Sequence, residues 1–134
     1  MSLPNSIFSA SRKDAIAQAN GKKANVGGLY EFGGITDLDF SNLFSIIAGE
    51  EFNFDLHEIL PLEAETDCEL FELPKRFIEV SAEKSESDVN SIASEWAATE
   101  ELECEPENLV PIVSSFISLC KSAGSNNVYF TVGA

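Results

Sequence analysis

The C-terminal stretch of residues 108–132 reads NLVPIVSSFISLCKSAGSNNVYFTV, and it joins a helical pattern to a strand pattern. Its first half repeats apolar residues at helical spacing until Gly124, namely at Leu109, Ile112, Val113, Phe116, Ile117 and Cys120. We expect Asn108 to cap this helix, because Pro111 then lies in the first turn, where its missing N–H is not needed. The β-forming run 128–132 is apolar on both faces, so it predicts a central strand.

The same two kinds of pattern recur along the rest of the chain. Further helices are predicted at 11–19, 37–48, 74–82 and 85–97, and short strands at 29–32 and 68–73. Residues 50–62 fit a loop with one helical turn better than a strand. The fold class predicted is α+β, with about five helices packed around a small sheet of about three strands. We expect a single globular domain over residues 1–134.

The chain is strongly acidic, and its charge is concentrated in one part. The 134 residues carry 23 acidic and 8 basic side chains, for a net charge of -15. Residues 50–107 alone hold 19 acidic and 3 basic side chains, interleaved with apolar ones. This interleaving favours solvated faces of folded elements over a disordered acidic tail. Such a charge disfavours binding to nucleic acid and to anionic lipid surfaces.

The sequence predicts a cytoplasmic protein without a membrane anchor. No apolar run approaches the ~18 residues of a membrane span, and Met1–Asn5 lacks the features of a signal peptide. The cysteines Cys68, Cys104 and Cys120 are odd in number and form no CxxC pair, which suits a reducing compartment. Cys120 is expected in the core. Cys104, between two glutamates, is expected to be unreactive.

The chain has no complete sequence motif for phosphate binding, calcium binding or histidine-based catalysis. Gly28–Ile35 lacks the lysine and hydroxyl of a phosphate loop, and the acidic run that starts at Asp37 lacks the glycine and glutamate of a calcium loop. His57 is the only histidine, and its acidic neighbours predict a surface side chain rather than a catalytic base. Trp96 is expected to pack in the core rather than to hold a ligand. We therefore assign no catalytic, cofactor-binding or metal-binding residue.

The order of several motifs along the chain is similar to that of known proteins. Gly49-Glu50-Glu51, Leu73-Pro74 before a helix, the run Trp96–Leu102, a long apolar helix and a terminal strand together resemble a group of small uncharacterised bacterial proteins. The chain is also loosely similar to YfbM-like proteins, whose helices surround a small sheet. The resemblance implies a bacterial cytosolic α+β protein, and it carries no catalytic residue to any position of this chain.

The function expected is that of a noncatalytic binding protein whose acidic face meets a basic protein partner. An immunity or inhibitor protein that masks a cationic surface is the most specific version. The predicted contact residues join two helices and are Glu100, Glu101, Glu103 and Glu105. One alternative is a small hydrolase or transferase with a buried carboxylate. Another is a structural homodimer with an exposed apolar patch, so the chain is expected to be a monomer or a homodimer.

Overall fold

The computed structural model describes residues 4–99, 102 and 104–133, which form a four-stranded antiparallel sheet and six helices. The strands are β1 (Pro4–Ala10), β2 (Gly27–Gly33), β3 (Glu69–Glu72) and β4 (Asn127–Val132). The helices are α1 (Arg12–Ala19), α2 (Asp37–Ala48), α3 (Phe54–His57), α4 (Lys75–Ala82), α5 (Glu86–Ala97) and α6 (Pro106–Ser122). The predicted α+β class is confirmed, while the expected five helices and three strands are each one too few.

The sheet has the strand order β2-β1-β4-β3, so β4 is an internal strand, as its two apolar faces predicted. Ile7 of β1, Phe130 of β4 and Phe71 of β3 stand opposite one another in the antiparallel register. All three side chains are buried in the main core, and a shift by one residue would move each of them to the opposite face of the sheet, so packing in this core specifies the register.

Strand β1 has no counterpart among the elements predicted from the sequence. Its residues Asn5, Ser6 and Ser9 are polar and hide the strand pattern. The polar side chains are satisfied inside the sheet: the Asn5 amide donates to the carbonyl oxygens of Ile35 at 2.8 Å and Thr131 at 3.1 Å, and its side-chain oxygen accepts the Ile35 N–H. Hydrogen bonding thus replaces the apolar alternation that identifies most strands.

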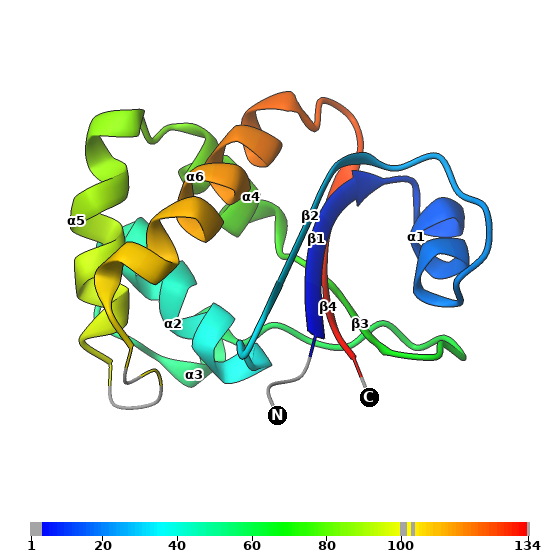
Figure 1. Ribbon diagram of the computed structural model, residues 1–134, viewed down its shortest axis with the longest axis horizontal. Helices are drawn as coiled ribbons and strands as arrows, with labels where there is room; N and C mark the ends of the chain where they lie inside the picture. Colours follow the sequence, from blue (N-terminus) through cyan, green and yellow to red (C-terminus); the bar gives the residue numbers. More distant parts are fainter. Residues whose placement is uncertain (1–3, 100–101, 103, 134) are drawn as a thin grey trace.

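The two faces of the sheet are covered unequally. Figure 1 shows α2, α4, α5 and α6 on one side of the sheet and α1 alone on the other. The main core lies on the first side around Phe40, whose ring is 4.3 Å from that of Phe130 and 5.2 Å from that of Phe116. Trp96 is fully buried there and donates its indole N–H to the Asp39 carbonyl at 2.8 Å. The predicted core positions of Trp96 and Cys120 are confirmed.

Helix α6 begins earlier than its pattern predicted. Glu105 is the N-cap and Pro106 occupies the first turn, so the expected cap at Asn108 is wrong. Pro111 consequently lies inside the helix and cannot bond the Glu107 carbonyl. Both residues are exposed, so water can hydrogen-bond that carbonyl in place of the missing N–H.

Candidate functional site

The glutamates predicted to contact a partner are only partly described by the structure. Glu105 is the exposed N-cap of α6. Glu100, Glu101 and Glu103 lie outside the described residues. Their proposed role in binding remains a prediction.

A different segment carries the most unusual surface that the structure describes. Residues 51–60 lie around α3 and expose four large apolar side chains: Phe52 at 37%, Phe54 at 55%, Leu56 at 58% and Leu60 at 62% of their area. Only two other large apolar side chains, Leu29 and Leu38, are exposed among the described residues. A concentration of exposed apolar side chains on one segment is typical of an interaction site.

The same segment is acidic. Glu51, Asp55 and Glu58 are exposed between the apolar residues, and no lysine or arginine stands between Lys23 and Lys75 in the sequence. We define the α3 surface as the exposed side chains of Glu51, Phe52, Phe54, Asp55, Leu56, Glu58 and Leu60. Figure 1 places α3 beside α2, at the end of the molecule away from α1.

A buried histidine anchors this segment to the rest of the protein. His57 is fully buried, so the expectation of a surface histidine is wrong. Its ring lies edge-on to Phe44 at 5.0 Å and stacks on Phe52 at 5.9 Å. Two aromatic neighbours supply the burial that the acidic residues next to His57 in the sequence gave no reason to expect.

The hydrogen bonds of His57 fix its tautomer. Nδ1 accepts the backbone N–H of Asn53 at 3.0 Å, so the ring proton is on Nε2, which donates to Glu50 Oε1 at 3.0 Å. Glu50 Oε2 accepts from Arg76 of α4 at 2.5 Å. The Arg76 guanidinium lies 5.7 Å from the centre of the Phe44 ring. The His57 side chain therefore bonds to both Asn53 and Glu50, and Glu50 also bonds to Arg76. These bonds attach the segment 50–57 to helix α4.

The electrostatics of Glu50 follow from these contacts. The hydrogen bonds from Arg76 and His57 lower the pKa of Glu50 from 4.5 to about 2. The hydrogen bond to Glu50 in turn raises the pKa of Arg76. Glu50 is therefore a permanent carboxylate at neutral pH, with its two oxygens already occupied. It positions the α3 surface, whereas Glu51, Asp55 and Glu58 remain available to a partner.

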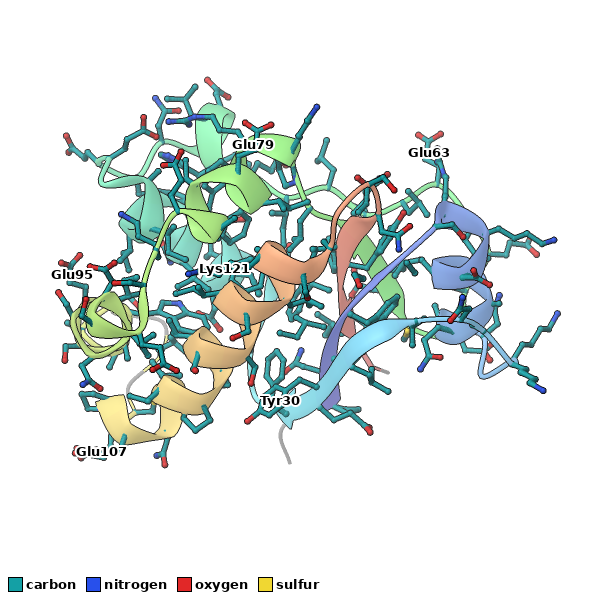
Figure 2. All side chains as sticks on the ribbon, turned by 90° about the horizontal axis from the view of Figure 1, so that it is seen from above. Tyr30, Glu63, Glu79, Glu95, Glu107 and Lys121 are labelled. Carbon is teal, nitrogen blue, oxygen red and sulfur yellow. The ribbon has the colours of Figure 1, made fainter. Side chains whose placement is uncertain are left out.

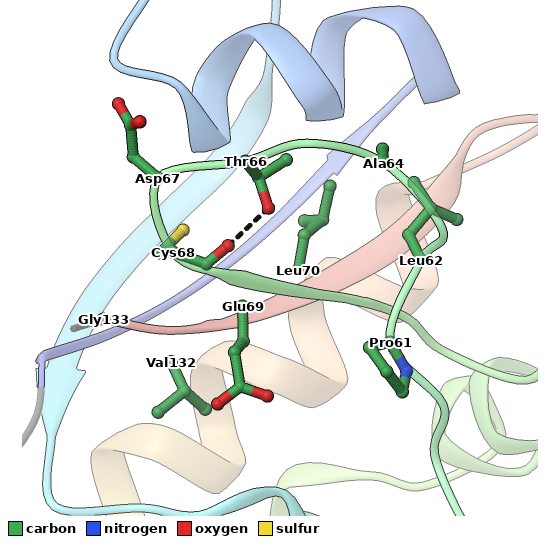
Figure 3. A pocket seen from close by; sticks show the side chains of 10 residues that line it. All are labelled: Pro61, Leu62, Ala64, Thr66, Asp67, Cys68, Glu69, Leu70, Val132 and Gly133. Carbon is green, nitrogen blue, oxygen red and sulfur yellow. Dashed lines mark hydrogen bonds between the residues drawn. The ribbon is translucent and has the colours of Figure 1, made fainter.

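A hollow of about 320 Å³ lies beside the end of β3 and is shown in Figure 3. Its wall combines Leu62, Thr66, Cys68 and Glu69 with Val132 of β4. Desolvation raises the pKa of the Cys68 thiol, and the nearby charge of Asp67 raises it further. The thiol also donates to the Ala19 carbonyl at 3.6 Å. The raised pKa keeps Cys68 in its thiol form, whereas a nucleophilic cysteine needs the thiolate form.

The other groups considered for chemistry have structural roles in the fold. Asp39, a buried carboxylate, accepts the N–H of Thr36 at 2.9 Å in the capping box of α2. Burial raises the pKa of Cys120 to about 12 and, together with Asp39 and Glu105, raises the pKa of Cys104. Over residues 4–99, 102 and 104–133, no group of three or more His, Cys, Asp or Glu side chains could hold a metal ion. In the same ranges, no helix is long and apolar enough to cross a membrane.

Comparison of the chain with protein-family models, curated proteins and solved structures finds no match. The candidate site therefore rests on its own residues. The sequence patterns singled out the 100–105 cluster and missed the α3 surface, although Phe52, Phe54 and Leu56 alternate with acidic or amide residues over 50–58.

Proposed function

We propose that this chain is a noncatalytic binding protein that uses the α3 surface to hold a basic protein partner with apolar side chains among its cations. The observation that carries the proposal is the exposure of Phe54, Leu56 and Leu60 on a segment that is otherwise acidic. An immunity or inhibitor protein that masks a cationic surface is the version of this function that we favour.

The two kinds of side chain have separate tasks. Apolar anchors supply most of the affinity at a protein interface, because they leave water on binding. Charges at the rim act mainly on the encounter rate, which they raise for a partner of opposite sign. Phe54 and Leu56 are the proposed anchors, and Glu51, Asp55 and Glu58 supply the steering field. Glu100, Glu101, Glu103 and Glu105, which precede α6 in the sequence, are proposed to add to this negative charge.

The anchoring by His57 and Glu50 supports this function. Holding a loop in one conformation before binding reduces the entropy lost in the complex. The bonds from His57 to Asn53 and Glu50 hold the α3 segment in this way without using its exposed side chains.

The test begins with affinity capture from an extract of the cells that express the protein, with the parent chain and variants as parallel baits. Phe54→Ser and Leu56→Ser should lose a protein that the parent retains and releases in salt. Leu38→Ser, which changes an exposed leucine outside the α3 surface, is the matched control and should retain it.

Kinetics with the captured protein then separate the two tasks. The triple variant E51Q/D55N/E58Q should slow association about tenfold at low ionic strength with little change in dissociation, whereas Leu56→Ser should speed dissociation. E100Q/E101Q/E103Q/E105Q should also slow association. The charge-matched control E79Q/E83Q/E86Q changes Glu79 on α4, Glu83 at the C-cap of α4 and Glu86 at the start of α5, and should have a much smaller effect. A salt-insensitive association rate, or a partner equally retained by Leu56→Ser, would refute the proposal.

A further inference from the structure

The sheet has two edge strands, β3 and β2, and their outer sides are covered to different extents. The outer side of β3 is occupied, because Pro61 bridges Phe71 and the N–H of Leu62 donates to the Leu70 carbonyl at 2.7 Å. The outer side of β2 has no such cover: among the described residues, β1 is the only strand that pairs with β2. Figure 2 shows β2 at the border of the molecule, with Tyr30 on it and α6 alongside.

Strand β2 lacks most of the features that usually prevent pairing with another chain, although its register with β1 shifts between Ile7 and Ser9, as at a β-bulge. Its seven residues, GGLYEFG, contain no proline or lysine, and Glu31 is their only charge. Leu29 is 43% exposed, and Tyr30 and Phe32 are only partly buried. A groove of about 330 Å³ runs between β2 and α6 and is lined on the helix by Leu119 and by the four serines Ser114, Ser115, Ser118 and Ser122. The serines are small, so α6 leaves a hollow beside the open edge, while Leu119 lies against Gly28.

We propose that a second copy of this chain occupies that edge, with the two β2 strands paired antiparallel about a two-fold axis near Tyr30. The result is a homodimer with one continuous eight-stranded sheet. This assembly is independent of the α3 surface, so it adds to the proposed binding function without resting on it.

Charge is what selects a second copy as the occupant. The segment before β2 carries the exposed cations Lys22 and Lys23, and helix α2, which follows β2 in the chain, begins with the exposed anion Asp37. Lys23 and Asp37 are each seven residues from Tyr30, the middle residue of β2. Antiparallel pairing brings the basic flank of each copy onto the acidic flank of the other, and a parallel arrangement would place like charges together.

The distribution of charge along the chain also favours the β2 edge as the contact surface. A chain of net charge -15 repels its own copies over most approaches. The first 49 residues, which include α1, β1 and β2, hold four acidic and four basic side chains and are neutral as a group. Strand β2 belongs to this neutral part of the chain, so contact along its edge brings less like charge together than contact through residues 50–107 would.

The first test measures assembly directly, by sedimentation velocity of the full chain over a range of concentrations up to about 1 mM. A monomer–dimer equilibrium is expected, accompanied by slower amide exchange over 27–33 in the dimer than in the dilute monomer. A chain that stays monomeric over this range would overturn the proposal, and so would a dimer whose 27–33 amides exchange as fast as in the monomer.

The second test is a charge exchange across the interface. Lys23→Glu and Asp37→Lys should each weaken dimerisation about tenfold, because each reversal acts twice in a two-fold dimer. The double variant K23E/D37K should recover the parent dissociation constant to within about threefold. Asp37→Asn, which removes the charge with less disturbance at the start of α2, should weaken the dimer about threefold.

Lys75→Glu is the matched control, since it makes the same charge change on α4, away from β2, and should leave the dimer constant within about threefold of the parent. Equal weakening by Lys23→Glu and Lys75→Glu would show general repulsion and overturn the specific pairing. Failure of the double variant to recover would do the same, provided that its circular dichroism matches the parent. No partner protein enters these assays, so their failure leaves the α3 surface proposal untouched.

Discussion

Replacement of His57 by alanine tests whether a buried imidazole holds the α3 surface in place. The His57 ring is fully buried between Phe44 and Phe52, and truncating it leaves a cavity worth about 2 to 3 kcal/mol. The Asn53 N–H also loses its acceptor at Nδ1, which costs about 1 kcal/mol. The bond to Glu50 adds little, because water can reach that partly exposed carboxylate. We expect a total loss of about 3 to 4 kcal/mol.

Urea unfolding followed by far-ultraviolet circular dichroism measures this loss, and amide exchange reports on the segment itself. His57→Ala should speed exchange at 51–58 more than in the β4 strand, since the anchor is local. Arg76→Met is the control, because Arg76 belongs to the same network but is 48% exposed, and it should shift the urea midpoint much less. A loss below about 1 kcal/mol with unchanged exchange at Asn53 would refute the reasoning that the ring is an anchor.

The core, Glu50 and the thiols each allow a further test. Trp96→Ala should cost about 3 to 5 kcal/mol in urea unfolding, and Trp96→Phe about 1 to 3 kcal/mol, because phenylalanine keeps most of the packing but removes the indole N–H that donates to the Asp39 carbonyl; a loss below about 1 kcal/mol for alanine would place Trp96 at the surface. Since Arg76 and His57 lower the pKa of Glu50 from 4.5 to about 2, its stabilising contribution is present above pH 4.5 and lost as the pH falls through about 2. Unfolding of the parent and Glu50→Gln at a series of pH values should therefore show a difference at pH 6 that disappears near pH 2, and a constant difference would contradict the assignment. Burial raises the pKa of Cys68, Cys104 and Cys120, so a thiol reagent at pH 8 should react far more slowly with the native than with the unfolded chain, and most slowly at Cys120; equal rates at the three thiols would argue against this order.

Elements with their own periodic pattern could be predicted from the sequence. Helix α5 follows the Val89, Ile92, Ala93 and Trp96 stripe, and all four residues are buried. Strand β4 was identified by its β-forming residues and lies inside the sheet. In both elements, the residues that define the pattern are those that leave water on folding, so the local signal and the tertiary force coincide.

Prediction failed where neighbours far along the chain decide the outcome. Strand β1 is stabilised by Asn5 contacts with Ile35 and Thr131, at sequence separations of 30 and 126 residues, which no local pattern reveals. His57 is buried by Phe44 from another helix. The α3 surface was missed for the converse reason, since its apolar residues look like core residues until the structure shows that nothing covers them.

The pairing of β1 with β4 has a consequence for how the chain folds during its synthesis. The two strands stand side by side in the middle of the sheet, yet one spans residues 4–10 and the other 127–132. The ribosome synthesises the amino-terminal end first, so β1 is made long before β4, the strand that pairs with it inside the sheet. Closing so long a loop is entropically costly and is typical of slow folding. Until then, the side of β1 that pairs with β4 in the folded protein has no partner, and this open strand edge is what a chaperone would have to protect.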